Sequence, residues 1–326
     1  MNERSKPWWM IAIWLTVASL APAASEWLLR IDLNVGDSHR FAISNSQSVK
    51  MDMGEMTQDV ENTSRIEFLQ TVIEELSDGS FVLDTSYERV QSEMRVGEMR
   101  LEFDTANPEP SQHPMARMQQ VMIGKHFSVT MTPRGEVRSV AGTNEIFDSI
   151  AEMFSDDRTI QGTLDTVKQG FGDEAMMSMM QQVAVMFPEQ AVSAGDTWQN
   201  EVTLPNPALG ELRIKSDYRI AGPGSKSGSD CLEIAVAMTI EFGNEGQMFA
   251  QLSRLLGTEL DIDVLNASGE GTLCMDPATG LVIDSQMQQV MEMDVSVGIP
   301  SEGEAEGQTM ELHALINQQF GIELLD

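Results

Sequence analysis

The sequence predicts an α+β fold: one large, curved antiparallel β-sheet with helical inserts packed on its concave face. Three observations predict it. Apolar and polar residues alternate along many stretches, which is typical of strands with one buried and one wet face. Turn signals such as Pro133-Arg134-Gly135 divide these stretches into hairpins. Apolar residues at helical spacing are confined to a few inserts.

Residues 1–23 are expected to be a cleaved signal peptide. Arg4 and Lys6 precede an apolar run from Trp8 to Leu20, and Ala21-Pro22-Ala23 provides an A-x-A cleavage site. No later segment approaches the roughly 18 uninterrupted apolar residues of a membrane span. The mature protein is therefore expected to be exported, to a periplasm or outside the cell, with no transmembrane segment after cleavage.

Residues 24–142 are expected to form a first β half. A regular apolar alternation predicts strands around Met99–Phe103 and Phe127–Met131, and a less regular one predicts strands between Ile66 and Tyr87. Ser77-Asp78-Gly79 is expected to close a hairpin between two of these strands.

Residues 143–190 are expected to form a helical connector. Apolar residues recur at three- and four-residue spacing in Thr143–Phe154, Thr159–Gln169 and Asp173–Phe187. Thr143-Asn144 and Asp173 are helix start signals, and Pro188 is a stop signal. Because a one-faced sheet leaves an apolar surface uncovered, we expect these helices to pack on its concave side.

Residues 191–326 are expected to form a second β half, compact with the first, with a short helical insert at Gln247–Leu256. Leu212, Ile214, Tyr218 and Ile220 alternate with charged residues, and Leu232–Phe242 shows the same pattern. A last strand is expected around Met310–Ile316.

A short motif recurs in the two β parts. Val35-Gly36-Asp37 is echoed by Ala194-Gly195-Asp196, and each copy leads into strands. One interpretation is that the chain consists of two similar β halves; the alternative is coincidence.

These motifs carry a resemblance. The Gly-Asp opening, the Asp-Gly hairpin and Gly135-Glu136-Val137 leading through Val140 and Gly142 into a helix resemble a family of secreted bacterial proteins of unknown function. In architecture, a curved sheet with helices across its hollow is similar to the periplasmic lipoprotein carriers. Neither resemblance assigns a functional residue to this chain.

The chain is strongly acidic, with a formal net charge of -31. Such a charge repels phosphate backbones and anionic lipid headgroups, which disfavours nucleic-acid partners and electrostatic docking on membranes. The charge is also explained by a surface kept soluble by acidic residues.

Cys231 and Cys274 are the two cysteines of the chain. Exported proteins commonly pair their thiols. Cys231 opens one predicted strand and Cys274 closes another that could run antiparallel beside it, so a disulfide is predicted. A redox or metal role is the alternative.

Signals for catalysis or cofactor binding are absent from the sequence. The four histidines show no metal-ligand spacing, and neither a G-x-S-x-G nor an H-E-x-x-H motif occurs. Gly222–Gly228 lacks the Gly-Lys pair of a phosphate loop. No catalytic, cofactor or metal residue is therefore predicted, although a site assembled from distant residues stays open.

Methionine is the compositional oddity, with 24 in the chain. Candidate residues of an apolar cavity lie on one predicted helix and one predicted strand: Met176, Met177, Met179, Met180, Met287 and Met291. Core packing is the first interpretation, since methionine fills irregular apolar spaces. The alternatives are an adaptable ligand cavity and Cu(I) binding through thioethers.

The sequence leads to a function hypothesis with two alternatives. The first is an exported, non-enzymatic protein that binds a lipid-like or other apolar small molecule in a hollow between sheet and helices, without a cofactor. The second is a structural or interaction role with an envelope protein, and the third is a methionine-rich, copper-handling protein.

Overall fold

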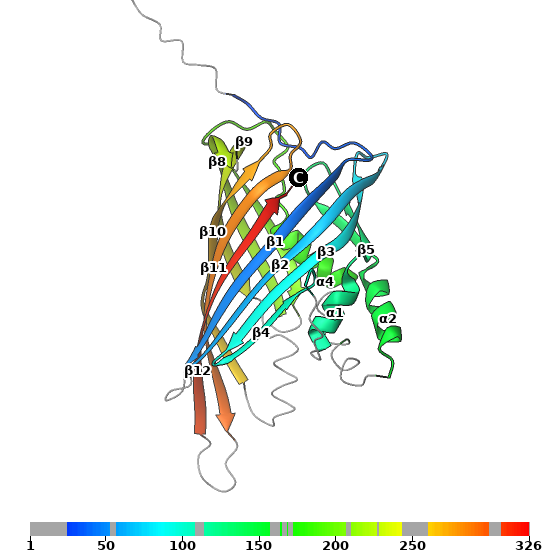
Figure 1. Cartoon of the computed structure of the whole chain (residues 1–326). Helices are drawn as coiled ribbons and strands as arrows, with labels where there is room; N and C mark the ends of the chain where they lie inside the picture. Colours follow the sequence, from blue (N-terminus) through cyan, green and yellow to red (C-terminus); the bar gives the residue numbers. More distant parts are fainter. Residues whose placement is uncertain are drawn as a thin grey trace, which may run out of the picture.

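The computed structural model describes residues 25–52, 57–107, 114–156, 164, 168, 172–206, 210–226, 228–242, 260–299 and 308–325. Figure 1 shows long strands that lie side by side in one curved sheet. The predicted dominance of antiparallel sheet is therefore confirmed. The predicted signal peptide at 1–23 and the predicted helix Gln247–Leu256 lie outside the described residues, as does Thr159–Gln169 apart from positions 164 and 168.

Twelve strands form one sheet in the described part of the chain. Their bounds are β1 Ser38–Asp52, β2 Thr57–Glu75, β3 Phe81–Val96, β4 Met99–Asp104, β5 His126–Met131, β6 Val137–Ala141, β7 Thr197–Asn206, β8 Gly210–Lys226, β9 Ser229–Phe242, β10 Leu260–Met275, β11 Val282–Ile299 and β12 Gln308–Leu324. Several of these strands extend well beyond the alternating apolar stretches from which they were predicted, as β8 does on both sides of Leu212–Ile220.

The strand order is β6-β5-β3-β2-β1-β12-β11-β10-β9-β8-β7, with β4 paired to β3 beside this path. The strand pairing between the most distant parts of the described chain joins β1 to β12 at the middle of the order, from Phe41 opposite Leu324 to Asp52 opposite His313. Strands β6 and β7 stand at the two ends of the path.

Strand parity divides the sheet into two faces. Side chains alternate along a strand, and directly paired residues share a face. We call the face that carries the buried apolar clusters the inner face and the opposite one the outer face. Ile214, Ile220 and Ile234 are buried on the inner face, whereas Arg213 and Glu233 are exposed on the outer face. The predicted parity of β8 and β9 is confirmed.

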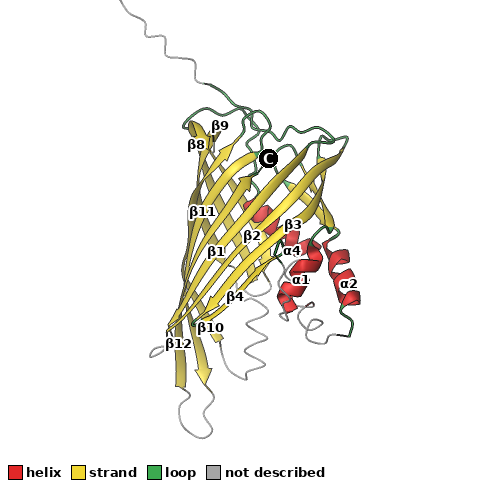
Figure 2. Ribbon diagram, in the orientation of Figure 1, coloured by secondary structure: helices red, strands yellow, loops and turns green. Residues whose placement is uncertain are grey.

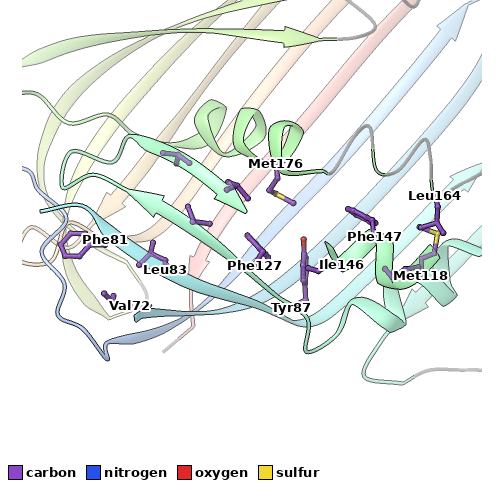
Figure 3. Close-up of a cluster of buried hydrophobic side chains, with 14 of the residues drawn as sticks. Val72, Phe81, Leu83, Tyr87, Met118, Phe127, Ile146, Phe147, Leu164 and Met176 are labelled. Atoms are coloured by element: carbon purple, nitrogen blue, oxygen red, sulfur yellow. The ribbon is translucent and has the colours of Figure 1, made fainter. Parts of the chain in front are cut away.

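Two clusters of buried side chains lie on the inner face. The first combines strand residues such as Phe127 and Val129 with helix residues such as Ile150 and Met176, as Figure 3 shows in part. The second combines Ile234 and its neighbours on β8–β11 with Leu29 and Phe187 from loops. Each fully buried aliphatic side chain stabilises the fold by about 1.5–3 kcal/mol.

The described helices lie beside the sheet, as Figure 2 shows. They are α1 Pro114–Met122, α2 Thr143–Met153 and α4 Asp173–Val183. The prediction of α2 is confirmed within one residue. The predicted end of α4 near Pro188 is wrong, because Ala184 is already extended and the following residues bond to other segments. Helix α1 was not predicted.

Helix α4 fixes the start of α2. The Asp173 carboxylate accepts hydrogen bonds from the Thr143 amide at 2.8 Å and the Asn144 amide at 3.2 Å. It also accepts one from the Thr143 hydroxyl. A carboxylate at a helix N-terminus satisfies free amides and interacts favourably with the helix dipole. The two predicted start signals therefore meet at one junction between the helices.

Residues 25–34, here called the N-terminal strap, cross one end of the sheet. The Ile31 amide donates to the Pro133 carbonyl at 2.7 Å, and the Asp32 amide donates to the Thr279 carbonyl at 2.9 Å. Trp27 forms a β-bridge with Val192. The strap thus joins the β5–β6 turn, the β10–β11 turn and the segment that follows α4.

Gly280 allows the strap to approach the β10–β11 turn closely. It has a φ of 72°, and a Cβ there would lie 2.1 Å from the Arg30 carbonyl oxygen. Gly195 has a similar φ of 92° but open space around it. We therefore expect Gly195→Ala to destabilise the protein by about 1–2 kcal/mol and Gly280→Ala by about 3 kcal/mol or more, because overpacking adds to backbone strain.

Urea denaturation of the two variants checks this expectation. Equal denaturation midpoints for Gly280→Ala and Gly195→Ala would show that the strap does not pack closely against the β10–β11 turn.

The recurring Gly-Asp motif builds the same turn twice. The Asp37 carboxylate accepts from the Asn34 amide at 2.7 Å, and the Asp196 carboxylate accepts from the Ser193 amide at 2.8 Å. The Gly36 amide donates to the Val72 carbonyl of β2, and the Gly195 amide donates to the Ile220 carbonyl of β8. The division into two similar β halves, 24–142 and 191–326, with the connector 143–190 between them, stays a prediction.

Candidate functional site

The inner face is almost free of charge. Of the Asp, Glu, Lys and Arg residues in the described strands, the register places only Glu75 and Asp230 on the inner face. Both of these side chains are exposed and lie next to hairpin turns. The ionic side chains form pairs on the outer face instead, for example Arg89 with Asp104 at 2.6 Å and Lys215 with Glu241 at 2.6 Å. A charge-free surface on so acidic a chain is the feature that marks this face as a candidate site.

A line of uncharged residues, most of them with polar side chains and two without (Gly269 and Met238), crosses the inner face. Direct register partners connect eight strands from β2 to β7 through this line. Its members, here called the polar row, are Asn62, Gln47, Gln318, Gln289, Gly269, Met238, Ser216 and Asn200.

The amides of the polar row are half-buried and only partly bonded. Gln318 Nε2 donates to Asn45 Oδ1 at 2.9 Å, and Gln289 Nε2 contacts the Met238 sulfur at 3.6 Å. Within the described residues, the side chains of Gln47, Asn62 and Asn200 have no hydrogen-bond partner. Because an amide offers two donors and one acceptor oxygen, the row keeps free capacity for further hydrogen bonds.

Apolar residues flank the polar row along the central strands. On the side away from the strap, Val49, Ile316 and Met291 are half-buried and are direct register partners. On the side toward the strap, Phe320 is half-buried and Met287 is 8 % exposed. A polar line with apolar surface on both sides can contact a molecule that has the same pattern.

The six candidate cavity methionines occupy separate places. Met176 is buried in the first cluster, and Met177 and Met180 pack against that cluster. Met287 belongs to the second cluster, and Met291 lies on the inner face of the same strand, opposite Ile316. The side chain of Met179 lies outside what the structure describes. The cavity-lining role of these residues stays a prediction.

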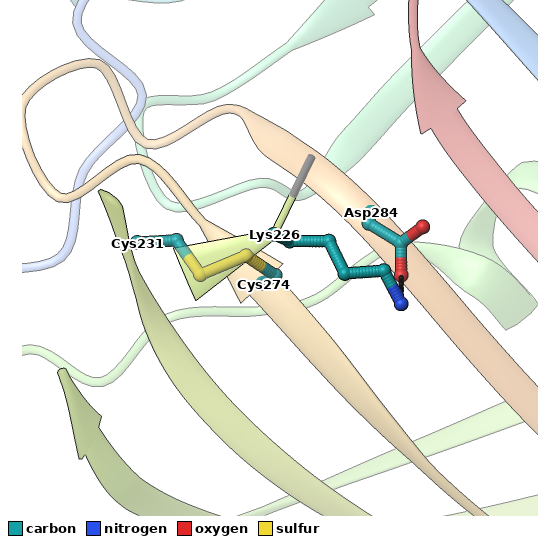
Figure 4. Close-up of a disulfide and its surroundings, with 4 residues drawn as sticks. All are labelled: Lys226, Cys231, Cys274 and Asp284. Atoms are coloured by element: carbon teal, nitrogen blue, oxygen red, sulfur yellow. Dashed lines mark ion pairs between the residues drawn. A yellow bond between two sulfur atoms is a disulfide. The ribbon is translucent and has the colours of Figure 1, made fainter. Parts of the chain in front are cut away.

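The predicted disulfide between Cys231 and Cys274 is present, with a Cα–Cα distance of 5.5 Å. Figure 4 shows it at one end of the β9–β10 pair, near the ion pair of Lys226 and Asp284 at 3.1 Å. It lies on the outer face and is buried there. Such bonds are typical of oxidising compartments, which agrees with an exported protein.

Titratable groups divide between the faces as the charges do. Burial raises the pKa of Tyr87 and of Tyr218 on the inner face. On the outer face, the Arg89 guanidinium lowers the pKa of Asp104 to about 2, and the hydrogen bond to Asp294 raises the pKa of His313. These shifts follow from burial, hydrogen bonding and ion pairing.

The histidines and acids form no metal centre in the described residues. His126 lies on the outer face, with Nδ1 2.8 Å from Asp84. His39 lies on the inner face, where its Nε2 is buried without a hydrogen-bond partner in the described part of the chain. His113 is outside the described residues. A shallow groove on the outer face is lined by the ion-paired Glu61 and Arg95.

Sequence reasoning missed the polar row. A signal was present, because Gln289 and Gln318 occupy the parity of apolar neighbours such as Met287 and Ile316. Only the strand register shows that these positions form one line.

None of the described helices has the length and apolar character needed to span a membrane. No curated protein matches the chain. Among solved structures, the chain is similar to lipovitellin, with 8% identity and a TM-score of 0.45, over 90% of this chain and 26% of that chain. It thus spans about a quarter of lipovitellin.

Two further structures are similar over most of both chains. OpdQ of Pseudomonas aeruginosa has 8% identity and a TM-score of 0.20, over 90% of this chain and 100% of that chain. A DUF1329 family protein of Desulfovibrio piger has 9% identity and a TM-score of 0.14, over 87% of this chain and 85% of that chain.

A family model matches residues 78–282, which run from the β2–β3 hairpin to the start of β11. The chain therefore belongs to the family of unknown function DUF6263.

Proposed function

We propose that this protein is an exported, non-enzymatic carrier or binder of a lipid-like ligand, which lies against the inner face between sheet and helices. The absence of charge from the central inner face carries the proposal. Burying apolar surface of a ligand is favourable, whereas burying an unpaired charge would be strongly unfavourable. The face thus offers what an apolar molecule requires.

The helices support the proposed location. Helix α4 contacts both β6 and β7, the two ends of the strand path, and α2 contacts β5. Gln181 Nε2 on α4 donates to the Val137 carbonyl of β6 at 3.1 Å. In the proposal these helices cover the concave side of the sheet, and the methionines of α4 supply adaptable apolar surface toward the ligand. The predicted signal peptide at 1–23 supports export of the protein, and the strap joins the turns at one end of the sheet.

The test compares two neighbouring residues on opposite faces of β11. Met291 is half-buried on the inner face and Val290 is 36 % exposed on the outer face. We expect Met291→Arg to weaken binding of the fluorescent hydrocarbon diphenylhexatriene by at least about tenfold, because the ligand would desolvate an unpaired charge. Val290→Arg should leave binding unchanged.

Fluorescence titration of both variants and of the uncharged variant Met291→Gln measures this effect. Met291→Gln is the control for the charge, since it removes the apolar contact of the methionine without adding a charged group. If the wild-type protein, freed of co-purifying lipid, binds no diphenylhexatriene, the proposal is wrong, and a structural or protein-interaction role in the envelope is the better account.

A further inference from the structure

We propose that the polar row is a recognition element for the carbonyl and hydroxyl groups of a neutral ester lipid. This inference rests on the proposed function, and it names the class of ligand. The row is continuous in register, and its members on the four neighbouring strands from Asn62 on β2 to Gln289 on β11 all carry side-chain amides. Neighbouring strands lie about 4.8 Å apart, so hydrogen-bonding groups recur along it at a spacing close to that between the polar groups of a glyceride.

The composition of the row fits a ligand that is polar but uncharged. Gln47, Gln289 and Gln318 can each donate and accept hydrogen bonds, as ester carbonyls and hydroxyls require. A bound carboxylate or phosphate would need a cation, and the register places no Lys or Arg on the described inner face. Without such a partner, a buried anion is strongly disfavoured. The net charge of -31 adds long-range repulsion.

The free hydrogen-bonding capacity of the row points to an external partner. A surface that binds hydrocarbon alone gains nothing from half-buried amides, because desolvating an unpaired amide is unfavourable. Gln318 is partly satisfied by Asn45, whereas Gln47 has no side-chain partner in the described part of the chain. Ester carbonyls would accept from these amides and offset that desolvation.

The rows on either side complete the match. Val49, Ile316 and Met291 form an apolar row beyond the polar row, and Phe320 and Met287 lie on its other side. A molecule with a polar ester centre and acyl chains leading away from it would place its centre on the amides and its chains on these apolar rows. A diacylglycerol is the simplest ligand of this class.

The chain offers a matched pair of variants for the test. Gln289 and Gln318 are register partners on the inner face, and the adjacent Gln288 and Gln319 are register partners on the outer face, where both are exposed. Gln289→Leu/Gln318→Leu removes two amides from the polar row. Gln288→Leu/Gln319→Leu removes the same two side chains from the outer face of the same strands and serves as the control.

The experiment measures binding of dioleoylglycerol, oleate and diphenylhexatriene to the delipidated full chain. We expect wild type to bind dioleoylglycerol more tightly than oleate. The inner variant should lose about tenfold or more in affinity for dioleoylglycerol, as expected for two hydrogen bonds, and should keep its affinity for diphenylhexatriene. The outer variant should bind all three molecules as wild type does.

The possible failures are distinguishable. A preference for oleate, or equal losses for dioleoylglycerol and diphenylhexatriene in the inner variant, would overturn the role of the polar row while leaving apolar binding in place. Absence of diphenylhexatriene binding by wild type would overturn the proposed function itself.

Discussion

Reduction of the Cys231–Cys274 disulfide is expected to lower the free energy of unfolding by about 4 kcal/mol. The bond connects residues that are 43 apart in sequence, on neighbouring strands β9 and β10. Its stabilisation arises mainly because the cross-link restricts the unfolded chain. Chemical denaturation of the oxidised and the reduced protein, followed by tryptophan fluorescence, measures the difference.

The double variant Cys231→Ala/Cys274→Ala is the control for this measurement. It should resemble the reduced protein, and its denaturation midpoint should not respond to reductant. The urea dependence should also become steeper without the cross-link, since the unfolded chain then exposes more surface. Identical midpoints for oxidised and reduced wild type would contradict a stabilising disulfide.

Ile234→Ala is expected to destabilise the protein by about 2–5 kcal/mol. Ile234 is fully buried in the second cluster, between Ile220 of β8 and Leu273 of β10. Truncation removes apolar burial and leaves a space that long, tightly paired strands fill poorly. Urea denaturation reports the change in stability.

Glu233→Ala is the matched control, because Glu233 directly precedes Ile234 in β9 and is exposed on the outer face. Its effect should stay within about 0.5 kcal/mol, as is usual for surface positions. Similar losses for both variants would mean that the two faces of β9 have been assigned the wrong way round.

The features predicted from sequence are those encoded over short distances. Period-two alternation located the strands and gave the inward parity of β8 and β9, because the strand repeat is a local property of the chain. The disulfide could be predicted because Cys231 and Cys274 stand at matching ends of two adjacent strands. The start of α2 at Thr143 was equally visible as a local start signal.

The features that sequence did not predict depend on distant contacts. Helix α1 has no acidic residue in its first turn and no basic residue in its last, so Pro114 was its one local signal. Helix α4 ends early because the segment after it bonds elsewhere, as when the Phe187 amide donates to the Arg134 carbonyl at 2.9 Å. The polar row exists only through register, which the sequence of a single strand does not contain.

The pairing of β1 with β12 has a consequence for biogenesis. The sheet's middle is formed by the first and the last of the described strands, so it cannot be completed until β12 has left the ribosome. Until then β1 remains an unpaired edge, which is a template for pairing with other chains. Such long-range pairing also slows folding. The free edge of β1 is therefore exposed to pairing with other chains until β12 has been synthesised.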